Sequence, residues 1–220
     1  MAARTAPVKE IPEPSPPELV DQPESLDALE RGEDYLEVRV DAIDLGGVDA
    51  SHAHLTRSEF IGTTLTAATL RAVNLVDVRF TDCELSGVDF HDAALHRVEF
   101  RNCRMVGVTL SEAELRHVRF VDCKLDDANL RLARLDHVRA DGCSMVEVDA
   151  YEASLTAVRF DTSDLSRADF SKVAVTGLDL RGSTIEALRG AAALHHIRIS
   201  ADQVIPFAAS VFAETGIRID

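Results

Sequence analysis

An apolar residue recurs at every fifth position from Leu45 to Ile185. Of these 29 positions, 15 are Leu, 7 are Phe and 2 are Met, and only Ala50, Ala140 and Ala150 are small, so chance does not explain the run. The position two residues earlier in each unit is also restricted, mainly to Val, Ala or Cys. The other three positions are mostly polar. Because an internal repeat of fixed period governs the whole architecture, it constrains the fold more than any local pattern does.

A period of five residues fits neither the period of an α-helix nor a long alternating strand, since alternation would change face at every repeat. The chain must therefore turn every five residues. Apolar side chains at the first and third positions of a very short strand share one face, and the polar remainder forms the corner. Four such units close a square coil. Coils stacked at about 4.8 Å, the spacing of paired strands, predict an all-β solenoid of about seven coils over residues 41–185, roughly 35 Å long.

Side chains twenty residues apart provide an independent check, because a coil of four units places them in one column. Identical residues recur at this spacing, so the sequence predicts a core in which like side chains stack on like. The columns are Cys83, Cys103, Cys123 and Cys143; Phe60, Phe80, Phe100, Phe120 and Phe160; Ala93, Ala113, Ala133 and Ala153; and Val78, Val98, Val118, Val138 and Val158.

The units Cys83–Leu85, Ala128–Leu130 and Ala168–Phe170 resemble the motif of the pentapeptide-repeat family. The resemblance implies a right-handed quadrilateral β-helix, in agreement with the coil inferred from the period. In general build the chain is also similar to the bacterial quinolone-resistance members, which are acidic rods that mimic DNA and occupy the DNA-binding saddle of type II topoisomerases. One departure is that only nine of the 29 units carry Asp or Asn before the central residue.

The chain as a whole divides into four parts. Residues 1–24 hold six of the seven prolines, and this composition predicts a disordered, acidic, proline-rich tail. Residues 25–40 are expected to form an N-terminal cap with a short helix from Ser25 to Glu30, stopped by Gly32, and a first strand over Tyr35–Val40. The solenoid of residues 41–185 follows, and residues 186–220 are expected to form a C-terminal helical element.

The C-terminal element carries its own helix signals. Ser200 and Gln203 form a capping box, Gly216 is a suitable stop, and Pro206 is expected to bend the helix. Apolar residues between them make one stripe, which either caps the open last coil or pairs two subunits into a homodimer. Resemblance to family members that dimerise through C-terminal helices supports the second use. The candidate capping or dimer contacts are Val204, Phe207, Val211 and Phe212.

The net charge of −15 opposes direct binding of nucleic acid, which requires clustered Lys and Arg, and suits a basic protein partner. The sequence shows no apolar run of about 18 residues and no basic-then-apolar N-terminal signal. We therefore expect a cytoplasmic protein without membrane contact.

Neither the cysteines nor the histidines predict a chemical site. The Cys column is a line about 14 Å long, whereas zinc requires four donors that converge at about 2.3 Å, so we expect buried, reduced thiols. His96, His117 and His137 lie together beside Arg97 and Arg116, but no carboxylate, Cys or Ser orients them for metal binding or proton transfer. An interior of Leu, Phe and Val leaves no substrate cavity. We predict no catalytic residue, no metal and no cofactor, and a chain that is not an enzyme.

The outward positions predict a rod with unlike sides, which either contact a protein partner or only keep the rod soluble. We expect a non-enzymatic protein-interaction scaffold. The alternative is a DNA-mimicking modulator of a type II topoisomerase (DNA gyrase) that confers protection from gyrase poisons, although Arg71 and Arg131 dilute the acidic face. The candidate acidic face is Asp49, Asp89, Asp92, Glu112, Asp149, Glu152 and Asp169, and the candidate basic column is Arg119, Arg139 and Arg159.

Overall fold

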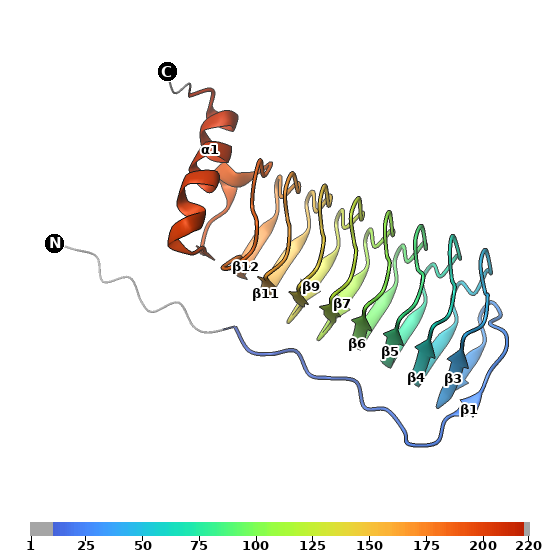
Figure 1. Cartoon of the computed structure of the whole chain (residues 1–220). Coiled ribbons are helices and arrows are strands. Elements are labelled where there is room, and N and C mark those ends of the chain that lie inside the picture. The colour runs from blue at the N-terminus through green and yellow to red at the C-terminus, as the bar shows by residue number, and fades with distance from the viewer. Residues whose placement is uncertain (1–10, 218–220) are drawn as a thin grey trace.

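The computed structural model describes residues 11–217 and shows a parallel β-solenoid of about eight turns with one C-terminal helix (Figure 1). Strand residues in the body of the rod pair with residues twenty positions further on, as Leu55 does with Leu75 and Phe60 with Phe80. This register is the one that the columns of identical residues predict. The predicted fold class, an all-β solenoid of twenty-residue coils, is therefore confirmed.

The strands line the two sides of the coil that carry the Leu55 and Phe60 columns. On the other two sides, isolated bridges such as Asp44↔Thr64 and Asp49↔Thr69 continue the ladder between coils. The strands are β1 (Glu24–Ser25), β2 (Asp34–Leu36), β3 (Val38–Asp41), β4 (His54–Ile61), β5 (Asn74–Thr81), β6 (Ala94–Arg101), β7 (Glu114–Arg116), β8 (Arg119–Val121), β9 (Arg134–Asp136), β10 (Arg139–Asp141), β11 (Ser154–Asp161), β12 (Ala174–Asp179) and β13 (Ile197–Arg198).

The corners of the coil lie two residues after each central apolar residue, and their backbone is left-handed. Asp92, His117 and Leu132, for example, have φ values of 58°, 55° and 61°. Left-handed backbone costs a residue with a side chain about 1–2 kcal/mol. Hydrogen bonds between coils, such as that from Asp92 N to Ser111 O at 3.0 Å, hold each corner in this conformation. The corners therefore exist because the stacked coils impose them, and their side chains point outward.

The central side chains are buried and stack along the rod. The rings of Phe60, Phe80, Phe100 and Phe120 are parallel within 14° or less, with successive centroids 4.7, 5.0 and 5.1 Å apart. Ala140 then interrupts this column. Face-to-face stacking at the coil spacing leaves no room for a ligand between these rings.

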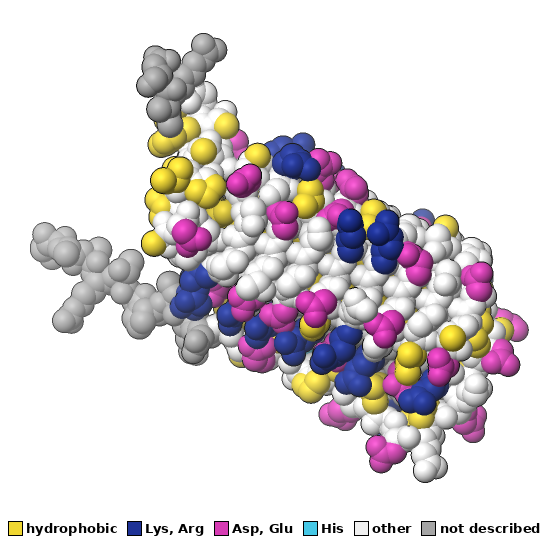
Figure 2. Space-filling model, viewed as in Figure 1, with side chains coloured by type: hydrophobic (Ala, Val, Ile, Leu, Met, Phe, Trp, Pro, Cys, Tyr) yellow, Lys and Arg dark blue, Asp and Glu magenta, His cyan; other side chains and the backbone are white. Residues whose placement is uncertain are grey.

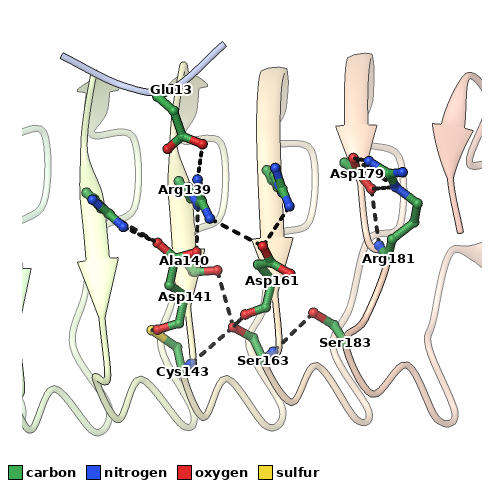
Figure 3. A network of polar contacts seen from close by, with 12 residues as sticks. Glu13, Arg139, Ala140, Asp141, Cys143, Asp161, Ser163, Asp179, Arg181 and Ser183 are labelled. Carbon is green, nitrogen blue, oxygen red and sulfur yellow. Dashed lines mark hydrogen bonds and ion pairs between the residues drawn. The ribbon is translucent and has the colours of Figure 1, made fainter. Parts of the chain in front are cut away.

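The Cys column is a ladder of small hydrogen-bond donors. The thiol of Cys103 donates to the carbonyl oxygens of Arg101 at 3.3 Å and Phe80 at 3.6 Å. The hydroxyl of Ser163 makes the same contacts two coils after Cys123, with the carbonyl oxygens of Asp161 and Ala140 (Figure 3). The four cysteines are free and buried. Hydrogen bonds with the neighbouring thiols, followed by burial, raise the pKa of Cys103, so this thiol remains protonated.

The predicted helix at residues 25–30 is wrong. Strand β1 (Glu24–Ser25) pairs with β3 instead, and the chain continues in extended form, with Leu26 N donating to Arg39 O at 2.8 Å. Extended backbone lets Leu29 reach the core, where it is 4% exposed and covers the first coil. Burial of this side chain outweighs the helix signal of the N-cap residue.

The predicted single strand at Tyr35–Val40 is two strands, β2 and β3, separated by Glu37 at a left-handed corner with φ 57°. Tyr35 pairs with Leu55 and Val40 pairs with Phe60. The five-residue repeat thus begins two units earlier than predicted, because Tyr and Val occupy central positions there.

The repeat ends at Gly190, which has φ 79° and precedes the short 3-10 helix η1 (Ala191–Ala193). A Cβ atom on this residue would lie 2.4 Å from the backbone of Phe170, so only glycine permits the chain to cross the last coil here. The chain then forms β13, a second 3-10 helix, η2 (Ala201–Gln203), and α1 (Val204–Thr215).

The predicted capping box of Ser200 and Gln203 and the stop at Gly216 are both present. Pro206 lies in the first turn of α1, where proline is tolerated because the first N–H groups have no intrahelical partner. The helix closes the open edge of the last coil, since Ser210 Oγ accepts a hydrogen bond from Leu188 N at 3.1 Å. Glu214 likewise accepts from the N–H groups of η1.

Candidate interaction surfaces

The inward side chains are buried and mostly apolar, so the candidate sites are surfaces. Among residues 11–217, no group of three His, Cys, Asp or Glu is arranged to hold a metal ion. In the same part of the chain, no helix is long and apolar enough to cross a membrane. Surface hollows lie beside Asp92 and Glu112, beside Glu147 and Arg167, under residues 13–17, and between α1 and the last coil.

Four of the seven predicted acidic residues form one column with a structural task. Each carboxylate accepts a hydrogen bond from the backbone N–H two residues later, at 2.8–3.0 Å. Asn129 makes the same contact with Arg131 N at 3.1 Å. This is the Asx turn, in which a short carboxylate or amide side chain stabilises a turn of its own backbone. The four residues of this Asx column are Asp49, Asp89, Asp149 and Asp169.

The second oxygen of each of these carboxylates faces an arginine. Every partner belongs to a coil next to that of its aspartate. These contacts are partly exposed, so each stabilises the fold only modestly, but each cancels one negative charge on the acidic face. The pairs are Arg31–Asp49 at 3.9 Å, Arg71–Asp89 at 3.3 Å, Arg131–Asp149 at 3.0 Å and Arg189–Asp169 at 3.3 Å.

The other three predicted acidic residues, Asp92, Glu112 and Glu152, lie in one corner column. Glu152 pairs with Lys172 at 3.2 Å. Within residues 11–217, neither Asp92 nor Glu112 has an ion pair. These two residues, on adjacent coils, define what we call the acidic corner. A hollow of about 530 Å³ beside it is lined by Asp92, Ala93, Ala94, Glu112, Glu114, Leu132 and Arg134.

The predicted basic column is present but is not a free cationic surface. Arg119, Arg139 and Arg159 follow one another on successive coils, and two aspartates lie between them. Arg139 also pairs with Glu13 from the N-terminal segment (Figure 3). Three arginines thus face three carboxylates. The remaining contacts are Arg119–Asp141 at 2.9 Å, Arg139–Asp141 at 2.6 Å, Arg139–Asp161 at 3.3 Å and Arg159–Asp161 at 2.7 Å.

The three predicted neighbouring histidines do lie together at the next corner. The ring centroids of His96 and His117 are 6.1 Å apart, and those of His117 and His137 are 4.9 Å apart. Burial, followed by the charges of His137 and Arg116, lowers the pKa of His117. Burial and the adjacent guanidinium groups also lower the pKa of His96. A neutral imidazole can accept a hydrogen bond, and His117 Nδ1 accepts one from Ser15 N at 3.2 Å.

The prediction that no carboxylate orients these histidines is wrong for His137. Its Nδ1 atom lies 2.7 Å from Asp136 Oδ1.

A comparison with known protein families matches residues 41–101 and 93–170 to the pentapeptide repeat region. The two segments overlap and together span more than half of the chain. This chain belongs to the pentapeptide-repeat family.

Several solved structures resemble this pentapeptide-repeat protein. One is HetL from the cyanobacterium Nostoc, a pentapeptide-repeat protein involved in the regulation of heterocyst differentiation. It is 18% identical to this chain, with a TM-score of 0.38, and the alignment covers 76% of this chain and 87% of HetL. Full-length QnrB1, a plasmid-mediated fluoroquinolone resistance protein, is 22% identical, with a TM-score of 0.41 and coverages of 88% and 95%. A comparison with curated protein sequences gives no match.

The N-terminal segment of this pentapeptide-repeat protein lies against the histidine corner. The prediction of a disordered tail covers residues 1–24, of which residues 1–10 lie outside the described residues. Residues 11–23 run from the first coil back along the rod (Figure 1). Glu18 N donates to Asp77 Oδ1 at 3.0 Å, and Ser15 and Glu13 contact His117 and Arg139. Sequence reasoning missed this surface, because proline content reveals an extended chain but not what it touches.

The predicted C-terminal contacts divide between two faces of α1. Phe207 and Val211 pack against the core of the repeat and close its end. Val204 is 53% exposed, and its neighbour Ile205 is 80% exposed. Figure 2 shows hydrophobic side chains gathered on the surface of α1. Phe212 is half-buried. A groove of about 760 Å³ between the helix and the last coil is lined by Glu186, Ala187, Leu188, Arg189, Ile205, Pro206, Ala209, Ser210, Ala213 and Glu214.

Proposed function

We propose that this pentapeptide-repeat protein is a non-enzymatic protein-interaction scaffold whose acidic corner binds a basic segment of a protein partner. The observation that carries the proposal is that Asp92 and Glu112, unlike the Asx column, have no ion pair within residues 11–217. Beside them lies Leu132, which is 48% exposed. Two unpaired charges and an exposed apolar side chain suit a segment that carries Lys or Arg next to an apolar residue.

The test compares protein capture by the wild-type chain and by the Asp92→Asn/Glu112→Gln variant, with chemical cross-linking in both cases. The matched control is Asp122→Asn/Asp127→Asn, which also neutralises two carboxylates at left-handed corner positions, but on other corners. We expect a basic protein to be captured by the wild type and the control and lost from the first variant. Equal capture by all three chains would exclude the acidic corner as the interface.

The second candidate function is a DNA-mimicking modulator of DNA gyrase that protects the enzyme from its poisons. The alignment of carboxylates along one side of a straight rod favours it. The ion pairs with Arg71, Arg131 and Arg189 oppose it, because each reduces the negative potential that a DNA mimic requires.

A gyrase supercoiling assay, with and without a fluoroquinolone, decides this second function. It compares the wild-type chain with the triple variant Asp89→Lys/Glu112→Lys/Asp149→Lys. Inhibition or protection by the wild type that the variant loses would support the gyrase function and locate its face. An absence of effect from both chains would reject it.

We also propose a homodimer that forms through the exposed apolar side of the C-terminal element. Phe207 and Val211 are already used within the chain, so Val204 and Ile205 are the residues that a second subunit would cover. Sedimentation of Val204→Glu/Ile205→Glu should show a monomer where the wild type is a dimer, and Ala201→Glu on the exposed part of η2 is the control. A wild-type chain that stays monomeric at every concentration would contradict the dimer.

A further inference from the structure

The contacts of the N-terminal segment follow the spacing of the coils. From Asp77 to His117 there are two coil steps, which is about 9.6 Å. From Glu18 to Ser15 there are three residues, which in polyproline II conformation also span about 9.3 Å. The spacing of the two backbone donors, Glu18 N and Ser15 N, therefore matches the spacing of their two acceptors on the rod.

The prolines of this segment leave few backbone donors, and the rod uses most of them. Between Pro12 and Glu18, only Glu13, Ser15 and Glu18 have an N–H group. Two of the three donate to the rod, and Glu13 contacts it through its carboxylate instead. The prolines also restrict the free segment to extended conformations, which lowers the entropy lost on docking.

The rod complements the segment in charge. Without Glu13, the basic column has three arginines against Asp141 and Asp161, so the carboxylate of Glu13 completes the balance.

We propose that the corner from Asp77 to Arg139 is a binding groove for an extended, acidic, proline-rich segment, and that residues 11–18 occupy it in cis as a displaceable strap. The strap covers the cationic part of the column, so a partner segment of the same chemistry binds only when the strap leaves. This surface is separate from the acidic corner.

The experiment uses full-length chains and a fluorescent, end-blocked peptide with the sequence of residues 11–20. In the Glu13→Lys chain the strap loses its ion pair with Arg139, and we expect it to bind the peptide about tenfold more tightly than the wild type does. Arg139→Glu should abolish peptide binding in the Glu13→Lys background. The matched control in that background is Arg159→Glu, a residue of the same column that contacts Asp161 and not the strap, and it should retain binding.

A second measurement follows the strap itself through cleavage after Glu18 by a glutamate-specific protease. Cleavage should be about tenfold faster in Glu13→Lys than in the wild type, because proteolysis tracks the population of the undocked segment. Equal peptide affinity for wild type and Glu13→Lys, or equal cleavage rates, would overturn the proposal. Protection that increases with protein concentration would overturn the assignment in cis, because it would show a strap exchanged between two copies.

Discussion

The buried side-chain amide of Gln203 donates a hydrogen bond of 2.6 Å to the carbonyl oxygen of Leu180, and so joins the C-terminal cap to the last full coil. The same nitrogen donates to Ser183 O. Carbonyl groups at the end of a solenoid lack the hydrogen-bond donors that a following coil would supply. The side-chain amide of Gln203 takes the place of these donors.

Gln203→Leu should therefore destabilise the protein by about 1–3 kcal/mol, since it removes both hydrogen bonds and leaves the carbonyl oxygen of Ser183 without a donor. The carbonyl oxygen of Leu180 keeps the hydrogen bond from Ser183 N at 3.2 Å. The exposed neighbouring change Asp202→Ala is the control and should alter stability by less than about 0.5 kcal/mol. Urea denaturation of the two variants measures both effects. Equal midpoints for Gln203→Leu and the wild type would show that water satisfies these carbonyl groups.

The two glycines Gly190 and Gly87 allow backbone strain to be separated from steric clash. Both have left-handed φ values, 79° and 68°, but only at Gly190 would a Cβ atom meet backbone, that of Phe170 at 2.4 Å. Gly87→Ala should cost about 1 kcal/mol from the backbone conformation alone. Gly190→Ala should cost clearly more and increase hydrogen exchange in α1. Similar losses for both substitutions would refute the close approach.

The donor ladder predicts how the Cys column tolerates substitution. Cys103→Ser keeps a donor for the carbonyl oxygens of Arg101 and Phe80, as Ser163 does naturally in the same column. Cys103→Ala removes that donor and should lower the free energy of unfolding by about 1 kcal/mol more than Cys103→Ser does. Thermal unfolding of the pair checks the order, and a more stable Ala variant would mean that packing alone selects this residue.

Stability should fall on mild acidification because of the histidine corner. The pKa of His117 is lowered in the folded protein by burial and by the charges of His137, Arg116 and His96, although Asp136 opposes the shift. An unfolded histidine has a pKa of about 6.5, so the unfolded chain takes up protons first and the free energy of unfolding decreases below that pH. The melting temperature of His117→Gln should vary less between pH 7.5 and 5.5 than that of the wild type. Identical profiles would assign the effect elsewhere.

The central residues could be predicted from the sequence because one physical requirement, burial inside a coil of fixed length, repeats without interruption. Leu55 and Phe60 are visible in the sequence for that reason. The helix expected at Ser25 failed because the N-cap signal is local, whereas Leu29 is placed by the open end of the solenoid.

The surface was harder to predict because outward side chains have two uses that look alike in sequence. Asp89 and Asp92 are both outward carboxylates, yet Asp89 stabilises a turn and pairs with Arg71, whereas Asp92 has no ion pair within residues 11–217. Only coordinates show which arginine reaches which coil. Ser15 and His117 are in contact although 102 residues separate them, and no periodic pattern in the sequence indicates this contact.

In a stack of coils, each turn touches only the turns beside it, so loss of structure can start at either end and travel inward one step at a time. Residues 13–18 touch coils that are not neighbours, since Asp77 and Arg139 lie about three turns apart. Peeling the rod at one end must then also release a contact near its middle. The segment therefore links coils that do not touch one another. As a result, more coils of the rod unfold together than nearest-neighbour contacts alone would require.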